Sequence, residues 1–457
     1  MSVSEGLRPG TEAGDGRIRD RDRGPPASET GNKDLIASKI TDLRHYDVLG
    51  IDRVAAICCW GRSGSYLLAS LLDGHDDVIM LPTSVGQFIY RFWEKYQHLS
   101  LREKLLAYPR FVEQQMPDPV FGNIRYNDGF FRGEFRIDQS DYDAAVAALL
   151  AVYGGQPGEV LESRSTFLRF LVVAYNLALG RRPANPRPMI IHPQHIWSNA
   201  SARQLIADFP RCRFIHAVRD PISCLDSTFE HGVKLLNDSE FLAALEDRAY
   251  EEHRKHNYRF NYPAWKAFWS LIWRDGFHAG LEDRSIFVRF EDVHAQPRHT
   301  MGRIARWLGL SEGPVLLNST FNGKPWIVES AGQTWTGTRP GQVRRRARHL
   351  SWVDRSVVFA LFQENFEAWS YPYPRFFASR WGRAVCIGLI LAVPMRSELA
   401  SDLIMMRTLL LPALRNAKLG VAAGTVWRTL LARIGLRAVI FIELCRRVTV
   451  TRLAKPI

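Results

Sequence analysis

The sequence predicts an α/β fold in which helices flank a doubly wound parallel sheet, with a basic helical extension at the C-terminus. Five short runs rich in Val, Ile and Phe alternate with longer segments of helical apolar spacing, which is the order expected of a parallel sheet with crossover helices. Two of these runs end in arginine-containing loops that lead into helices. Because ligands of such sheets bind beyond the carboxyl ends of the strands, both loops are candidate sites.

The predicted strands are short and have polar residues at their ends. They are Arg53–Cys59, Val78–Leu81, Met189–Ile191, Arg213–Val218 and Ser285–Arg289. The predicted helices are Ser65–Leu72, Gln87–Ala107, Asp141–Val152, Ser165–Leu179, Ser198–Asp208, Ile222–His231, Glu240–Asn257, Ala264–Glu282 and Gln296–Leu308. A loop-rich segment is expected over Leu310–Leu350, followed by a closing helix over Val353–Glu367.

Charge is distributed unevenly along the 457 residues. The net charge is +13, but residues 375–457 alone hold 14 Lys and Arg against three Asp and Glu, so the rest of the chain is nearly neutral. Residues 1–40 are polar and lack an apolar core, which predicts a disordered segment and not a signal peptide. The six cysteines lack the spacing of a metal site or a disulfide framework, which favours the reducing cytoplasm.

The loop after the first strand is the first candidate anion site. Gly61 and Gly64 would let backbone N–H groups approach an anion, and the helix that follows adds its dipole. Arg62, Ser63 and Ser65 supply side-chain donors. The loop is not a Walker A motif, because it lacks both the G-x-x-x-x-G-K-[ST] spacing and the lysine. A tight strand-to-helix turn with an exposed arginine is the alternative interpretation.

The second candidate site follows the fourth predicted strand. Asp220 is a natural N-cap residue and Pro221 a natural first helical residue, so a helix should begin there. The guanidinium group of Arg219 suits bidentate binding of a phosphate, and Ser227 lies about two turns along the helix. An N-cap beside a surface arginine is the alternative. Two such sites on one sheet indicate a ligand with phosphates at both ends.

Several short motifs, taken in order, resemble the P-loop-related sulfotransferases, which use 3′-phosphoadenylyl sulfate (PAPS) as sulfuryl donor. They are G-R-S-G-S-Y-L-L from Gly61, R-D-P with Ser227, V-R-F-E-D-V from Val288 and W-L-G-L from Trp307. The similarity spans residues 53–372 and implies a P-loop-like sheet, with residues 45–374 as the sulfotransferase catalytic domain.

The resemblance also implies the residues that bind PAPS. It assigns the 5′-phosphosulfate to the loop residues Arg62, Ser63, Gly64, Ser65 and Tyr66, and the 3′-phosphate to Arg219 and Ser227. It assigns Lys324, Pro325 and Trp326 to a later cofactor-facing loop, with Lys324 on phosphate and Trp326 against adenine. The family usually has Ser or Thr where Tyr66 stands, so the loop would depend more on its backbone N–H groups.

Sulfuryl transfer needs positioning and charge stabilisation, and cationic side chains suffice for a group that carries less charge than a γ-phosphate. The sequence contains no evident acidic motif for a metal, and none is expected. Arg62 would stabilise the leaving phosphate. His192 and His195 follow the third strand where relatives often have Lys-x-Pro, so His192 is a candidate for either the lysine or the base. Both histidines also suit a strand end and a helix cap.

Residues 375–457 combine apolar clusters with arginines, and none of the clusters reaches the roughly 20 residues that span a bilayer. This pattern predicts a basic amphipathic tail that lies on an anionic membrane surface, at the inner face of a membrane. A helical subdomain that packs on the body or on a second subunit is the alternative. Nucleic acid is not expected as a partner, because aromatic residues are not interleaved with the charge.

The function that these features predict is transfer of a sulfuryl group from PAPS to a hydroxyl of a carbohydrate or glycolipid-like acceptor. Two alternatives remain. A P-loop nucleotide kinase or other phosphotransferase would bind ATP with Mg²⁺, and a non-catalytic membrane-tethered scaffold would bind no nucleotide.

Overall fold

The computed structural model describes residues 29–446 except 60–61, 82–84, 116–129, 132–134, 194–198, 237–261, 273–280, 331–332 and 340–346. Its centre is a parallel sheet of five strands in the order β2-β3-β1-β4-β5. The strands are β1 (Val54–Cys59), β2 (Val78–Met80), β3 (Met189–Pro193), β4 (Arg213–Val218) and β5 (Ser285–Arg289). All five predicted strands are therefore confirmed, and so is the α/β fold class.

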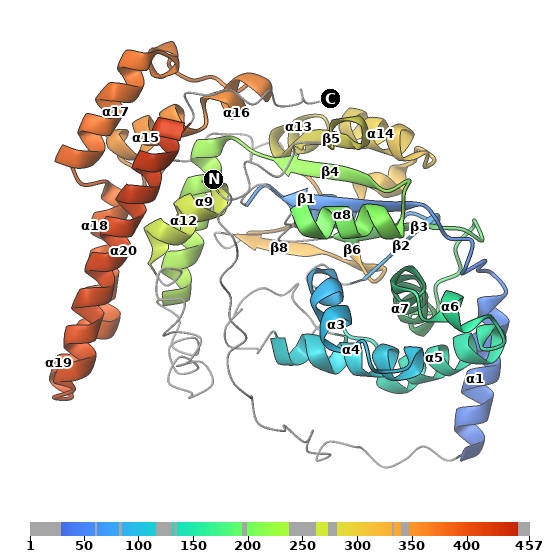
Figure 1. The fold of residues 1–457 in the computed structure, drawn as a ribbon. Helices are drawn as coiled ribbons and strands as arrows, with labels where there is room; N and C mark the ends of the chain where they lie inside the picture. The colour runs from blue at the N-terminus through green and yellow to red at the C-terminus, as the bar shows by residue number, and fades with distance from the viewer. Residues whose placement is uncertain are drawn as a thin grey trace.

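Alternate residues of the central strand enter cores on opposite faces of the sheet. Val54, Ala56 and Cys58 of β1 join one core, whereas Ala55 and Ile57 join the other. Helices cover both faces, as Figure 1 shows, which is why the central strands are apolar on both sides.

The first core is covered by helices from the first half of the chain. They are α1 (Glu29–Leu43), α3 (Ile89–Lys95), α4 (Leu101–Gln115), α5 (Gln139–Tyr153), α7 (Arg164–Ala178) and α8 (Asn199–Asp208), with the short η1 (Val85–Phe88) and α6 (Gly158–Leu161) between them. The second core is covered by α2 (Ser65–Asp73), α13 (Phe290–Ala295), α14 (Pro297–Leu308), η5 (Pro314–Leu317) and the hairpin of β6 (Thr320–Phe321) and β7 (Lys324–Pro325). A further hairpin joins β8 (Ile327–Ser330) and β9 (Gln333–Thr336).

Three expectations about helices need correction. Helix α1 begins at Glu29, so residues 29–40 are helical and the prediction of disorder is wrong for them. The helix predicted over Gln87–Ala107 is two helices, because Ser100 and Glu103 form a reciprocal cap that starts α4. The closing helix predicted over Val353–Glu367 divides at Phe362. The helix predicted over Glu240–Asn257 lies outside the described residues.

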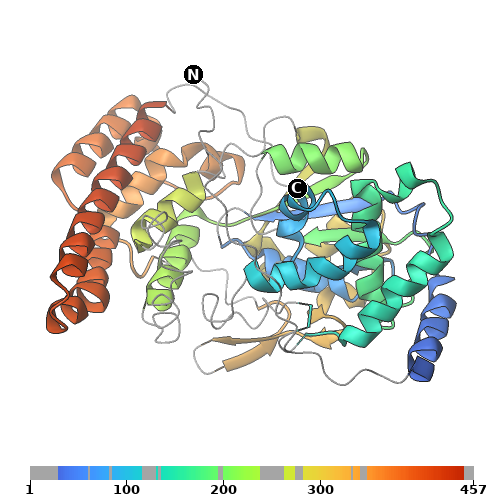
Figure 2. The same cartoon turned by 60° about the horizontal axis from the view of Figure 1, so that its bottom comes forward.

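A third core lies beside the sheet and joins the C-terminal helices to the body. Helices α9 (Pro221–Leu236), α12 (Pro263–Ile272), α15 (Trp352–Leu361) and α16 (Gln363–Ala368) share it with α17 (Arg380–Ala392), α18 (Arg396–Met405) and α20 (Leu419–Arg446). The short segments η8 (Met406–Leu410) and α19 (Leu411–Arg415) connect α18 to α20. Figure 2 shows these helices side by side at one end of the molecule. No helix of the described residues has the length and apolarity required to cross a membrane.

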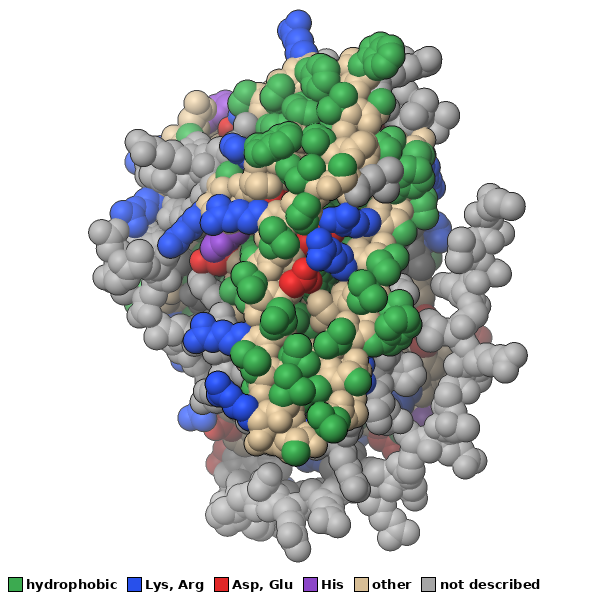
Figure 3. Space-filling view, turned by 90° about the vertical axis from the view of Figure 1, so that its left-hand side faces the viewer, with side chains coloured by type: hydrophobic (Ala, Val, Ile, Leu, Met, Phe, Trp, Pro, Cys, Tyr) green, Lys and Arg blue, Asp and Glu red, His purple; other side chains and the backbone are tan. Residues whose placement is uncertain are grey.

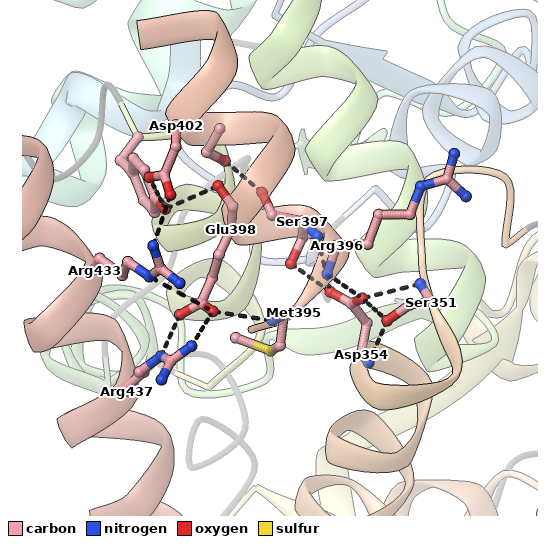
Figure 4. Close-up of polar contacts among 11 residues, drawn as sticks. Ser351, Asp354, Met395, Arg396, Ser397, Glu398, Asp402, Arg433 and Arg437 are labelled. Carbon is pink, nitrogen blue, oxygen red and sulfur yellow. Dashed lines mark hydrogen bonds and ion pairs between the residues drawn. The ribbon is translucent and has the colours of Figure 1, made fainter. Parts of the chain in front are cut away.

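Two buried carboxylates hold helix α18 in place (Figure 4). Asp354 of α15 accepts hydrogen bonds from the backbone N–H groups of Arg396 at 3.0 Å and Ser397 at 3.2 Å, so it caps α18 from another helix. Glu398 of α18 is 0% exposed and accepts from Nε and Nη2 of Arg437 in α20, both at 2.8 Å. The bidentate geometry compensates for the burial of the Glu398 charge.

We predict that Glu398→Ala lowers the free energy of unfolding by about 3 kcal/mol, because Arg437 loses a buried bidentate partner. The matched control is Glu443→Ala, which removes an ion pair of 3.6 Å to the exposed Arg446. Glu443→Ala should lower the free energy of unfolding by less than about 1 kcal/mol. Urea denaturation followed by circular dichroism measures both, and equal losses in the two variants would contradict the structural role of Glu398.

Candidate functional site

The loop between β1 and α2 adopts a conformation that requires glycine. Gly64 has a φ of +87°, in the left-handed region that side chains disfavour. A Cβ built on Gly64 would lie 2.3 Å from Cδ2 of Phe290, so no side chain fits there. Ser65 begins α2, Ser63 is buried and Arg62 is exposed. The start of α2 thus lies beside the loop, as predicted, whereas Trp60 and Gly61 lie outside the described residues.

The second loop connects β4 to α9, and its geometry follows the sequence prediction closely. Pro221 is the first residue of α9, and Asp220 Oδ1 accepts a hydrogen bond of 2.9 Å from the Ser223 N–H group, so Asp220 is the N-cap. Arg219 is buried at the end of β4 and its Nη1 donates to the Arg62 carbonyl oxygen at 3.3 Å. This hydrogen bond brings the two predicted anion loops together.

One donor of Arg219 has no partner among the described residues. Its Nε is buried and makes no hydrogen bond. A buried guanidinium N–H group without an acceptor costs free energy, so it is a signal for an anionic ligand at this position. Arg219 also contacts the Arg62 carbonyl and the ring of Phe290, 4.4 Å from the Arg219 Cζ, and its charge interacts with that of Glu291.

The V-R-F-E-D-V motif, residues 288–293, contacts both loops. Phe290 contacts the Gly64 position and stacks under Arg219. Glu291 accepts from the Asp220 N–H group at 3.2 Å and from the Tyr371 hydroxyl at 2.5 Å. Burial raises the pKa of Glu291. The motif therefore positions the anion loops, and its own acidic groups are engaged in holding the chain.

Lys266 is a site residue that sequence reasoning missed. It lies on α12, and its charge interacts with that of Arg62. Desolvation and the positive charge of Arg62 lower the pKa of Lys266 to about 8. Part of the Arg62 side chain is exposed, but the atoms packed around its guanidinium group desolvate it and lower its pKa. The positive charge of Arg219 lowers this pKa further, whereas Tyr66 and Glu230 raise it. The charge of Arg62 thus interacts with the charges of both Arg219 and Lys266, and a bound anion would relieve this repulsion.

The signal for Lys266 was present in the sequence. It is the one charged residue in the run from Ala264 to Ile272, on a helix that is otherwise mainly apolar. A lysine in such surroundings is desolvated, and desolvated lysines occur often at functional sites.

The remaining residues of the predicted phosphate sites are placed as follows. Tyr66, in the first turn of α2, is half-buried and close enough to Arg62 to influence its pKa. Ser227 is half-buried on α9, two turns after Arg219.

The structure does not bring the third predicted loop to these arginines. Gly323 donates from its N–H group to Asp73 Oδ2 at 3.2 Å. Asp73 is the last residue of α2, whereas the anion loop precedes the first residue of that helix, so the two lie at opposite ends of α2. Lys324 and Pro325 are exposed in β7, and Trp326 is buried against Phe321 with ring centroids 5.6 Å apart. The assignment of Lys324, Pro325 and Trp326 to the donor is therefore not supported by their position. Trp326 belongs to the core under the hairpin.

His192 is a buried residue of β3. A Cβ on Gly86 would lie 2.6 Å from His192 Cε1, so the imidazole packs against the chain at Gly86. Burial lowers the pKa of His192 to about 4, well below the 6.5 that the sequence prediction assumed. The ring is neutral at pH 7 and supplies no positive charge, so His192 does not replace a cationic lysine. Its assignment as a base stays a prediction, and His195 lies outside the described residues.

No group of three or more His, Cys, Asp or Glu side chains in the described part of the chain is arranged to hold a metal ion.

Comparisons with known proteins give one family match and several weak structural similarities. A model of the Sulfotransferase family matches residues 55–313, and no curated protein matches the chain. Among solved structures, the sulfotransferase domain from the curacin biosynthetic pathway is similar with 17% identity and a TM-score of 0.33, over 75% of this chain and 99% of that one. Sulfotransferase STF9 from Mycobacterium avium is similar with 14% identity and a TM-score of 0.29, over 64% of this chain and 76% of that one.

We predict that anion binding at this site weakens as the pH rises through about 8, because Lys266 then loses its charge. Titration calorimetry with inorganic pyrophosphate measures the affinity. Lys266→Met should bind roughly tenfold more weakly below pH 8 and lose the pH dependence. Lys266→Arg should keep the affinity to higher pH. A wild-type affinity that is constant across this range would show that Lys266 does not contact the anion.

Proposed function

We propose that this chain, which belongs to the sulfotransferase family, transfers a sulfuryl group from PAPS to an acceptor hydroxyl. The observation that carries the proposal is the junction of Arg62 and Arg219. Among the described residues the buried Nε of Arg219 has no acceptor, and its Nη1 donates to the loop that contains Arg62. An anionic group at Arg219 and a second one at the first loop correspond to the two phosphate ends of PAPS.

The donor would be held by two loops with different chemistry. Around Gly64 and Ser65 the positive φ and the helix N-terminus favour the 5′-phosphosulfate, which needs N–H groups at close approach. The guanidinium group of Arg219, with Ser227 further along α9, suits the 3′-phosphate. Rigid placement of Arg219 by Phe290 reduces the entropy that binding would otherwise cost.

In the proposed reaction the acceptor oxygen forms a bond to sulfur while the bond between sulfur and the 5′-phosphate oxygen breaks. The products are a sulfate ester and adenosine 3′,5′-bisphosphate (PAP). Negative charge grows on the departing 5′-phosphate, and Arg62 and Lys266 are the cations close enough to each other to share its stabilisation. Lys266 is largely protonated at pH 7, since its pKa is about 8.

The acceptor hydroxyl must lose a proton. We assign this proton to His192, whose ring is neutral at pH 7 because burial lowers its pKa to about 4, and the same shift makes it a weak base. The burial of His192 at the end of β3 means that the acceptor oxygen would have to approach it from beyond the carboxyl edge of the sheet. A hydroxyl of a carbohydrate or glycolipid-like molecule is the acceptor that the family resemblance favours.

The family match supports sulfuryl transfer over the kinase and scaffold alternatives. The basic C-terminal helices support a location in the cytoplasm at the inner face of a membrane, where a lipid-linked acceptor would be available.

We predict that PAP binds the wild-type chain in calorimetric titrations without Mg²⁺, and that ATP shows no Mg²⁺-dependent binding. Arg219→Ala should lower the affinity for PAP by about tenfold to a hundredfold, because a charge-assisted contact of roughly 1.5–3 kcal/mol is lost. The matched control is Arg213→Ala, at the other end of β4, where the guanidinium group stacks on Trp307 at 5.0 Å. It should leave PAP affinity unchanged. Unchanged PAP affinity in Arg219→Ala would overturn the assignment, and ATP binding that requires Mg²⁺ would support the kinase.

A further inference from the structure

Helix α20 is apolar on two opposite faces, and the chain itself covers only one of them. The buried face includes Ala432, Leu436 and Ile440, which join the third core. Trp427 and Ile434, on the other side of the helix, are 61% and 56% exposed. Arg428, Arg433 and Arg437 also lie on α20, so the helix is not apolar all round, but an exposed apolar face of this kind is suited to a further apolar contact.

The exposed apolar residues gather on the C-terminal helices. Apart from Val152, Val160, Ile327 and Trp352, every exposed large hydrophobic side chain of the described residues lies after residue 375. We define the apolar face by Leu403, Met406, Leu414, Trp427, Ile434 and Phe441, from α18, η8, α19 and α20. Figure 3 shows many hydrophobic side chains distributed over this end of the molecule, with Lys or Arg and acidic side chains near its middle. Scattered single hydrophobic residues need no explanation, but a gathering of this kind marks an interaction site.

The acidic residues of these helices are largely withdrawn from the surface. Glu398 is fully buried in its pair with Arg437, and Asp402 accepts from Arg433 at 2.9 Å. The side chain of Glu443 is 18% exposed. These are the three acidic residues between 375 and 457, so the C-terminal helices expose little negative charge.

The basic residues, in contrast, border the apolar face. Arg407 follows Met406, Arg415 follows Leu414, and Lys418 precedes α20, and all three are exposed. An apolar surface with exposed basic residues beside it and few exposed acidic groups matches the surface of an anionic lipid bilayer, in which apolar side chains enter the headgroup region and cations meet lipid phosphates. Trp427 is suited to that boundary, since its ring is apolar and its N–H group is polar.

We propose that the apolar face rests on the surface of an anionic lipid bilayer. A second copy of this chain fits less well, because a two-fold dimer brings the same face of both copies together. The basic residues of both copies would then enter one interface that offers few exposed carboxylates to pair with them. The clamp of Arg433 and Arg437 on α18 keeps α20 fixed to the body. The chain therefore presents a preformed surface, and the proposal stands apart from the proposed sulfuryl transfer.

Flotation of the full chain with vesicles tests the proposal. The wild type should float with vesicles of phosphatidylcholine and phosphatidylglycerol, and much less with phosphatidylcholine alone or at high salt. Ile434→Asp should reduce binding by at least about tenfold, since a charge would enter the apolar region. Arg415→Glu should reduce binding to the anionic vesicles by about fivefold or more, at roughly 1 kcal/mol for each basic residue.

The matched control is Val152→Asp, an exposed valine on α5 at the other end of the molecule, which should float like the wild type. Circular dichroism and thermal unfolding establish that each variant is folded, without reference to donor binding. A wild-type chain that stays unbound to the anionic vesicles at low salt would overturn the proposal. So would sedimentation that shows a dimer which Ile434→Asp converts to a monomer, because the face would then belong to a second copy.

Discussion

The arrangement of the site depends on the ring of Phe290, which is held between two loops from different strands. On one side the ring fills the space where a Cβ of Gly64 would lie, at 2.3 Å. On the other side it supports the Arg219 guanidinium group, whose Cζ is 4.4 Å from the ring centroid. Since Phe290 begins the helix after β5, the ring connects the ends of β1, β4 and β5. The ring thus leaves no room for a side chain at Gly64 and covers one side of the buried Arg219.

Around this contact, positively charged side chains lie close together in a partly desolvated region. Arg219 is buried beside the Arg62 carbonyl, and Lys266 approaches Arg62 from α12. Without an anion the positive charges repel one another. A phosphorylated ligand relieves this repulsion, and its binding is more favourable because the fold already holds the side chains in position. The same principle of paired burial holds the C-terminal helices, where Glu398 and Arg437 are buried together.

Local signals in the sequence predicted the sheet and both anion loops. The run that ends in Arg219-Asp220-Pro221 specified a strand, a cap and a helix start through adjacent residues, and each is confirmed. Lys266 could not be placed in this way, because only tertiary packing brings α12 beside Arg62. The same limit applies to Trp326. The loop motif resembles a donor contact, whereas in the fold the tryptophan packs on Phe321 in the core, so its assignment to the donor stays a prediction that its position does not support.

A double-mutant cycle on PAP affinity tests the central role of Phe290 most directly. The cycle compares wild type, Phe290→Leu, Arg219→Ala and the double variant, with leucine keeping an apolar side chain against Gly64. If the ring acts by positioning Arg219, Phe290→Leu lowers the affinity for PAP when Arg219 is present but not in the Arg219→Ala background. The expected coupling energy between the two changes is about 0.5–3 kcal/mol. Losses that add within about 0.5 kcal/mol would contradict the account, because residues that act independently are additive.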